Sequence, residues 1–194
     1  MTTTGRTPAA HLEHVEAPGS MLTKTAARAL AILRISTGFV FLWAFLDKTF
    51  GLHYATPGER SWINGGSPTK GFLSGVDVGP FQGFFHSIAG NPLADWAFML
   101  GLLGVGVALI LGIGMRIAAV AATLMMAFMW FAELPPAQTN SAGEATHSTN
   151  PVTDYHVIYA VSAIALAATY AGHTWGLGRW WAKLPLVQKN RWLI

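Results

Sequence analysis

Four apolar segments of the chain are long enough, or nearly long enough, to cross a membrane as helices. They cover residues 26–45, 96–115, 117–132 and 155–172, and one crossing takes about 20 residues at a rise of ~1.5 Å per residue. Polar, Gly- and Pro-containing stretches follow the first and third segments, whereas residues 114–116 alone join the second to the third and require a tight hairpin. This pattern predicts an all-α fold, an integral membrane bundle of four transmembrane helices.

The distribution of Lys and Arg in the loops orients this bundle. If the amino terminus is cytoplasmic, Arg60 and Lys70 lie in an outer loop, and most other basic residues lie inside. Loops rich in Lys and Arg stay in the cytoplasm, so both termini are predicted to be cytoplasmic. We expect a disordered cytoplasmic tail over residues 1–25, a membrane domain over 26–174 and an interfacial cytoplasmic tail, rich in Trp, over 175–194.

The two outer loops carry local signals of their own. In the first, residues 51–91, the side chains of Phe81, Phe84, Phe85 and Ile88 fall on one helical face. That spacing predicts a short interfacial helix, which would act as a lid over the bundle. In the second, Asn150 suits an N-cap and Pro151 the first helical position.

Composition excludes several classes of protein. With 52% hydrophobic and 11% charged residues and a mean hydropathy of +0.40, the chain has too few polar side chains for a soluble domain. We therefore expect membrane lipid as a partner and a multi-pass location in the cell membrane. The net charge of +3 is spread along the chain, so no nucleic-acid partner is expected.

Metal and haem chemistry has little support in the sequence. The chain has no Cys, which excludes thiolate ligands, covalently attached haem and a thiol relay. His156 is the only His well inside a predicted span, so no pair of His residues can hold a haem between helices. His11 and His14 are interpreted as solvated residues of the tail. No bound metal or haem is expected.

Each predicted span brings ionisable side chains to its outer end, where a polar site could form. They are Asp47, Lys48, Asp95, Glu133, Asp154 and His156. For Asp95 and Asp154, which begin helices, the favourable helix dipole is the better explanation. Glu133 ends a helix, where the dipole is unfavourable, and we expect a cationic partner such as Lys48 or Arg34.

Two residues inside the spans have competing interpretations. Arg34 lies deep in the first span, where a cation is costly, and structural ion pairing and a contact with an anion or quinone are equally supported. His156 fits a hydrogen bond to a quinone carbonyl or a proton shuttle, but a packed structural His explains it slightly better. Four aromatic residues near the outer level fit either a quinone head group or an ordinary aromatic belt: Trp43, Trp130, Tyr155 and Tyr159.

Several motifs together resemble the DoxX/DoxD family of membrane proteins, in the fuller form of the DoxD-like branch. They include ALAILRISTGFVFLWAFLDKTFG, SWINGGSPTKGFL, GPFQGFFHSIAGNPLADW, GLLGVGVALILGIGMRIAA and NPVTDYHVIYA. The resemblance implies a four-helix membrane protein similar to the large subunit of thiosulfate:quinone oxidoreductase (thiosulfate dehydrogenase, quinone). That enzyme oxidises two thiosulfates to tetrathionate, passes the electrons to quinone and uses a small DoxA-like subunit. The family's polar motif residues match Arg34, Asp47, Lys48, Asp154 and His156.

Two hypotheses of function follow from the residues and the resemblance. In the first, the chain is an enzyme subunit in which thiosulfate binds beneath the first outer loop, at Lys48 with Arg34 or Lys70. Quinone would then enter beside Trp43 and Trp130, and His156 would move protons with Asp154 or Glu133. In the second, the chain is a non-catalytic scaffold that recruits a soluble redox or sulfur-handling enzyme in an oxidative-stress assembly. A small-molecule carrier is less well supported, because the chain has no internal repeat.

Overall fold

The computed structural model describes residues 23–146 and 148–194, and over these residues the fold is helical and contains no strand. Three helices are long and apolar enough to cross a membrane: α2 (Lys24–Phe50), α5 (Pro92–Leu111) and α6 (Met115–Glu133). A fourth apolar helix, α7 (Tyr155–Ala168), is shorter. The chain is therefore a helical membrane protein. The tail expected over residues 1–25, with His11 and His14, lies almost wholly outside the described residues.

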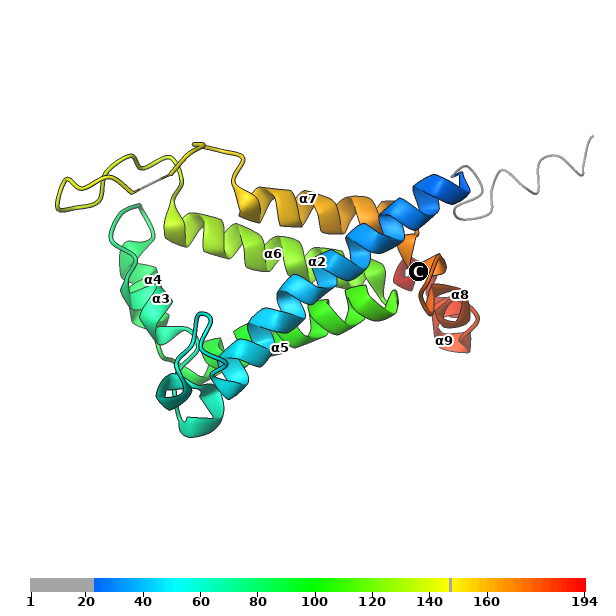
Figure 1. The fold of residues 1–194 in the computed structure, drawn as a ribbon, viewed down its shortest axis with the longest axis horizontal. Coiled ribbons are helices and arrows are strands. Elements are labelled where there is room, and N and C mark those ends of the chain that lie inside the picture. Colours follow the sequence, from blue (N-terminus) through cyan, green and yellow to red (C-terminus); the bar gives the residue numbers. More distant parts are fainter. Residues whose placement is uncertain (1–22, 147) are drawn as a thin grey trace, which may run out of the picture.

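The four apolar helices form two pairs that meet at one end and separate toward the other (Figure 1). Helix α2 packs along α5, and α6 packs along α7. The helix pairs meet where a tight turn joins α5 to α6, and we call this end of the bundle the hairpin end. The two long loops lie at the opposite, loop end, where short helices occupy the space between the pairs (Figure 1). Helices α3 (Lys70–Ser74) and α4 (Gln82–Ile88) lie there, whereas η1 (Gly58–Arg60) and η2 (Trp62–Asn64) lie beside the loop end of α2.

Local sequence explains where α5 begins and ends. The Asn91 side chain accepts a hydrogen bond from the Leu93 N–H and Pro92 follows it, which is a favourable start for a helix. Gly112 ends the helix with a φ of 71°, a backbone conformation that glycine adopts without strain. The second span was expected to continue to Met115. That residue instead begins α6, after a link of three residues.

The N-cap of helix α7 (Tyr155–Ala168) lies four residues later than the one expected at Asn150. The Asn150 side chain accepts hydrogen bonds from the N–H groups of Val152 and Thr153 and so forms a local turn. Asp154 is the actual N-cap, because its carboxylate accepts from the N–H groups of His156 and Val157. The prediction of Asn150 as N-cap is wrong because a side chain of this type can cap its own turn as readily as a helix.

The interior of the bundle is built from small and apolar side chains, and its outer surface is apolar as well. The buried core joins residues of all four helices, among them Phe41, Leu102, Ala122 and Leu166. Large apolar side chains also point outward from each helix and are half exposed or more, for example Ile32, Leu100, Leu124 and Ile164. An apolar surface of this extent is what membrane lipid would cover.

Arg34 is buried at the hairpin end and binds backbone carbonyl groups from two other parts of the chain. Its guanidinium donates to the carbonyl oxygens of Leu109 and Ile110, at the end of α5. It also donates to those of Thr174 and Trp175, at 3.3 and 2.9 Å, in the segment after α7. Carbonyls at helix ends lack partners within the helix and carry partial negative charge. These hydrogen bonds therefore offset the energetic cost of burying the guanidinium and provide donors for the carbonyl groups.

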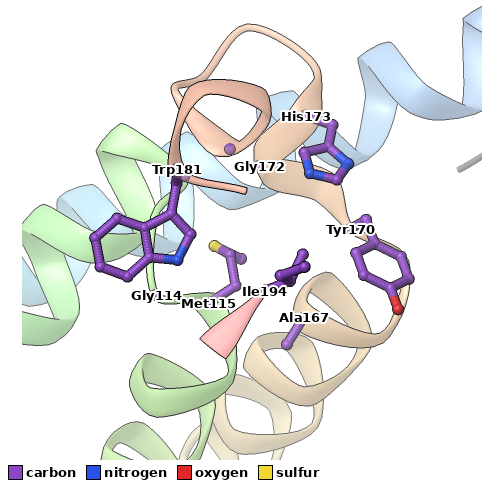
Figure 2. Close-up of a pocket in the computed structure, with 10 residues that line it drawn as sticks. Gly114, Met115, Ala167, Tyr170, Gly172, His173, Trp181 and Ile194 are labelled. Atoms are coloured by element: carbon purple, nitrogen blue, oxygen red, sulfur yellow. The ribbon is translucent and has the colours of Figure 1, made fainter. Parts of the chain in front are cut away.

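The carboxyl-terminal segment folds back onto the hairpin end. It contains η3 (Ala171–His173), α8 (Gly178–Trp181), α9 (Pro185–Lys189) and η4 (Arg191–Leu193). The indole N–H of Trp181 donates to the Leu193 carbonyl at 2.7 Å. Ile194 lies among Met115, Ala167 and Tyr170 (Figure 2). Gly172 permits a close approach here, since a Cβ on it would overlap the backbone of Gly112. The predicted interfacial tail is therefore packed on the protein.

Arg34 should be essential for stability and not replaceable by Lys. Arg34→Lys keeps the charge but cannot reach carbonyls on two elements at once, because an ammonium lacks the planar fork of donors. We expect a loss of at least about 3 kcal/mol in the free energy of unfolding, as for other buried charge networks that lose a partner. Thermal unfolding in detergent measures it. Arg28→Lys, at an exposed position of the same helix, should unfold as the wild type does, and an equal stability of Arg34→Lys would contradict this role.

Candidate functional site

Residues 51–91, which we call the cap, cover the loop end and are fixed there by two buried carboxylates. Asp47 accepts hydrogen bonds from the N–H groups of Tyr54 and Ala55, at 3.2 and 3.0 Å. Asp95 accepts from the Ser67 hydroxyl at 2.9 Å and from the N–H and hydroxyl of Thr69 at 3.0 and 2.6 Å. Both carboxylates therefore anchor the cap to α2 and α5. Asp95 lies in the first turn of α5, where an interaction with the helix dipole was expected, and its hydrogen bonds go to the cap.

The far side of the cap packs on α6 through aromatic side chains. The rings of Phe84 and Phe85 lie 5.9 and 5.2 Å from that of Phe128, and the Phe81 ring lies 5.4 Å from that of Phe131. The apolar face expected over residues 81–88 therefore contacts protein, and α4 lies within the expected segment. The cap thus spans from α2 and α5 to α6.

The second long loop is joined to the cap through Asp77. The carboxylate of Asp77 accepts hydrogen bonds from the hydroxyl and the N–H of Ser141, at 2.6 and 2.8 Å. These bonds favour the charged carboxylate and lower the pKa of Asp77 below its usual range. The contact is exposed, and it connects the loop after α6 with the loop after α2.

An apolar cavity of about 570 Å³ lies between α5 and α6, beneath the cap. Its walls come from four residues of α5, five of α6 and several of the cap. They include Phe72, Ala97, Phe98, Leu124 and Phe128. Among its described lining residues, Lys48 alone carries a formal charge. A cavity of this size and character suits a flat or elongated apolar molecule with one polar group.

A smaller cleft of about 310 Å³ adjoins the apolar cavity and is cationic. Lys48 and Arg60 both line it, together with hydroxyl-bearing residues such as Thr56 and Ser67. The cleft and the cavity share Lys48, Pro68 and Phe72. An anion in the cleft and an apolar molecule in the cavity would therefore bind on either side of the same Lys and Phe side chains.

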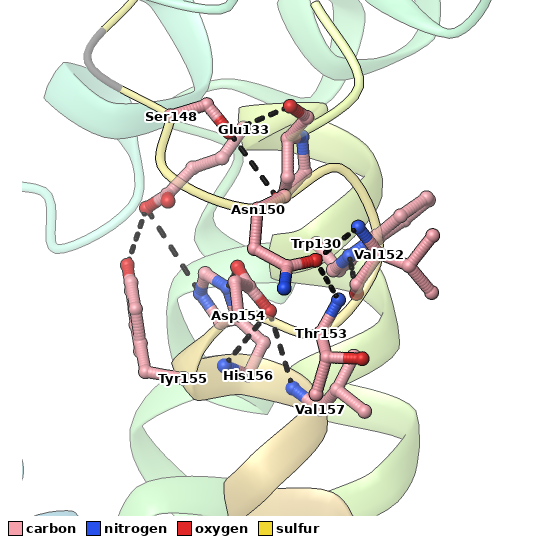
Figure 3. Close-up of polar contacts among 11 residues, drawn as sticks. Trp130, Glu133, Ser148, Asn150, Val152, Thr153, Asp154, Tyr155, His156 and Val157 are labelled. Atoms are coloured by element: carbon pink, nitrogen blue, oxygen red, sulfur yellow. Dashed lines mark hydrogen bonds and ion pairs between the residues drawn. The ribbon is translucent and has the colours of Figure 1, made fainter.

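A third cleft, of about 520 Å³, is lined by polar residues at the loop ends of α6 and α7, including Glu133, Asp154 and Tyr155. The Tyr155 hydroxyl donates to Glu133 Oε1 at 2.8 Å, and Nδ1 of His156 lies 2.7 Å from Asp154 Oδ2 (Figure 3). The His156 side chain is fully buried, and its Nε2 lies 3.9 Å from Glu133 Oε1. An imidazole between two carboxylates can transfer protons or bind a cation.

The structure brings together some of the expected site residues and separates others. Glu133, Asp154 and His156 form one cluster, and Asp47 and Lys48 belong to the cap region. The expected pairing of Glu133 with Lys48 or Arg34 is wrong, since its described polar partners are Tyr155 and His156. Arg34 precedes Lys48 by 14 residues on one helix, a separation of about 21 Å along its axis. It therefore lies far from the loop-end clefts.

The four aromatic residues expected at a quinone site are distributed over the loop end. Trp43 packs against Phe39 and Tyr54, and Trp130 donates from its indole N–H to the Val152 carbonyl at 3.1 Å. The Tyr155 and Tyr159 rings contact each other at 6.3 Å. Within the described part of the chain, no ring contact joins either Trp to this Tyr pair. Their role at a quinone site stays a prediction.

Two parts of the loop end were missed by the sequence-based interpretation. The apolar cavity was not expected, because its walls come from separate helices and no single motif marks it. Arg60 was assigned to an outer loop but not to a site. The sequence feature that could have indicated Arg60 is that only two basic residues, Arg60 and Lys70, occur in the loop predicted to cover the bundle. That loop follows Lys48 at the end of α2.

Comparison with protein families gives one match. The family model described as DoxX matches residues 29–133, more than half of the chain. The matched segment contains α5, α6, the cap and most of α2. A search of curated proteins gave no match, and neither did a search of solved structures.

Removing the Asp95 carboxylate should detach the cap from α5. Asp95→Ala deletes the acceptor of three hydrogen bonds, each worth on the order of 1–3 kcal/mol when the acceptor is charged. We expect trypsin to cleave after Arg60 and Lys70 at least tenfold faster than in the wild type, as measured by mass spectrometry of timed digests. Glu59→Gln, in the same segment, serves as the control. An unchanged rate in Asp95→Ala would show that the cap is held by other contacts.

Proposed function

Since the chain belongs to the DoxX family, we propose that it is the membrane subunit of an oxidoreductase that oxidises thiosulfate to tetrathionate and reduces quinone. One observation carries this proposal: a cationic cleft and an apolar cavity share Lys48 and Phe72. Thiosulfate is a small dianion, and the head group of a quinone is flat, apolar and bears carbonyl acceptors. The two neighbouring sites have the chemistry of these two substrates.

The cleft supplies positive charge where thiosulfate would bind. Lys48 and Arg60 compensate the two negative charges, and the Thr56 hydroxyl adds a neutral hydrogen-bonding group to the lining. Lys48 also lines the cavity, so its ammonium can donate to a quinone carbonyl there. The second cation of the proposed thiosulfate site is therefore Arg60, and not Arg34 or Lys70 as expected from the sequence.

The proposed reaction balances without a thiol of the protein. Two thiosulfates form one S–S bond between their outer sulfurs and release two electrons. The quinone takes up these two electrons with two protons and leaves as quinol. The chain has no Cys, so the new S–S bond joins the two substrate molecules directly. A small DoxA-like subunit would complete the enzyme and bind on the loop side, next to the cationic cleft.

We further propose that the chain crosses the cell membrane four times, with both termini in the cytoplasm. Helix α7 packs along α6 and continues into η3 at the hairpin end, which supports a fourth crossing despite its length. All described acidic residues lie at the loop end. Most described basic residues lie at the hairpin end, among them Arg28, Arg116, Arg179 and Lys183. A positively charged hairpin end is consistent with the cytoplasmic side.

Quinone reduction by thiosulfate tests the proposal directly. Membranes that contain the protein, with or without candidate partner subunits, should form quinol and tetrathionate in equal amounts. Lys48→Gln and Arg60→Gln should each raise the KM for thiosulfate by about 10- to 100-fold, since each removes a charged contact worth roughly 1.5–3 kcal/mol. Lys70→Gln is the matched control in the same loop and should behave as the wild type.

Formation of neither product under any of these conditions would contradict the enzymatic role. The alternative, a scaffold that recruits a soluble redox or sulfur-handling enzyme, would then account for the chain. The chain has no Cys and therefore cannot hold an iron–sulfur cluster by thiolates, which favours the scaffold alternative.

A further inference from the structure

The buried imidazole of His156 has one nitrogen that is held by the protein and one that is not. Its Nδ1 lies 2.7 Å from Asp154 Oδ2. Because an ionised carboxylate only accepts hydrogen bonds, Nδ1 carries the hydrogen, and in the neutral ring Nε2 carries a lone pair. Nε2 is buried and has no hydrogen-bond partner among the residues that the structure describes. An unpaired buried nitrogen is costly unless something else binds it.

The group that faces this nitrogen is the carboxylate of Glu133. Oε1 of Glu133 lies 3.9 Å from Nε2, too far for a hydrogen bond. Two atoms that each bind one metal ion at about 2.1 Å lie roughly 3–4 Å apart, depending on the angle between them. The observed separation falls in that range. The closest ligand atoms of Glu133, Asp154 and His156 all lie within 4.8 Å of one another.

We propose that His156 Nε2 and the Glu133 carboxylate bind a divalent transition-metal ion at the loop end of α6 and α7. Asp154 is a positioning residue, since it fixes the orientation and tautomer of the His ring. Its other carboxylate oxygen accepts from the N–H groups of His156 and Val157, so its own position is fixed by α7. A carboxylate that orients a metal-binding His in this way recurs in protein metal sites.

The surroundings fit such an ion. The imidazole is fully buried, whereas the Glu133 side chain is 37% exposed and lines the polar cleft of about 520 Å³. Water from this cleft can fill the remaining coordination positions, so the ion would be accessible from the loop side. One imidazole with carboxylate oxygens suits Zn²⁺, Mn²⁺ or Fe²⁺, and without thiolates the site does not select Cu(I).

The sequence did not indicate this site because its ligands come from different helices. Glu133 and His156 are 23 positions apart, and neither belongs to a spaced ligand motif. The expectation of no bound metal rested on Cys and on pairs of His, whereas this donor set needs neither.

Zn²⁺ binding to the purified full-length protein tests the proposal. After treatment with a chelator, the protein in detergent should bind one Zn²⁺ at the site with a micromolar or lower Kd, measured by calorimetry. Glu133→Gln and His156→Gln should each weaken binding at least tenfold, and Asp154→Asn by about 10- to 100-fold through the loss of orientation. Zn²⁺ should also raise the melting temperature of the wild type and not that of Glu133→Gln.

Two controls separate this site from adventitious binding. Glu144→Gln alters a carboxylate in the same loop and should bind as the wild type does. The double variant His11→Gln and His14→Gln removes two further His residues and should retain the Zn²⁺ site. Glu133→Gln changes a partly exposed side chain, so we expect it to fold even if the buried His156→Gln does not. Thermal unfolding verifies that Glu133→Gln is folded. The proposal is wrong if the wild type binds no Zn²⁺ at 100-fold molar excess, or if a folded Glu133→Gln binds it equally well.

Discussion

The buried guanidinium of Arg34 is the interaction on which the arrangement of the helices depends. A cation inside an apolar span is expensive, and here it is compensated by the carbonyl groups at the end of α5 and in the segment after α7. One side chain thereby joins α2, α5 and the turn that follows α7. The hairpin end is closed as a result, and the helix pairs can separate only toward the loop end (Figure 1).

The separation at the loop end creates the space that the cap covers. Asp47 and Asp95 anchor one side of the cap, and the Phe residues around Phe128 anchor the other. The cap is therefore built into the fold and is not a loose loop over it. Its position gives the cavity between α5 and α6 a roof, and it places Arg60 near Lys48 in the adjoining cleft. Asp47, which was expected at a catalytic site, and Asp95 here have a structural role, which in turn positions the basic residues.

Patterns within one segment could be predicted from the sequence, and contacts between segments could not. The apolar lengths predicted the helices, and the aromatic face around Phe85 predicted α4. The depth of Arg34 in its helix marked it as unusual, but the choice between an ion pair, a ligand contact and carbonyl partners required the position of α5. The same limit applies to Asn150. Whether its side chain caps a turn or a helix depends on the conformation of the residues that follow it. The sequence placed Glu133 and His156 at the same end of the bundle, but the 3.9 Å separation of their side chains depends on how α6 and α7 pack, which no spacing reveals.

The central claim is that quinone binds between the helix pairs, in the cavity beside Lys48. Photolabelling in native membranes with an azido-quinone analogue, followed by peptide mapping, tests it most directly. The claim predicts labels on the cavity-lining parts of α5 and α6, around Phe98 and Leu124, and their loss in Ala97→Trp, which fills the cavity. The exposed Leu93→Trp should keep them. Labels confined to Trp43 and Tyr159, or labels unaffected by Ala97→Trp, would contradict it.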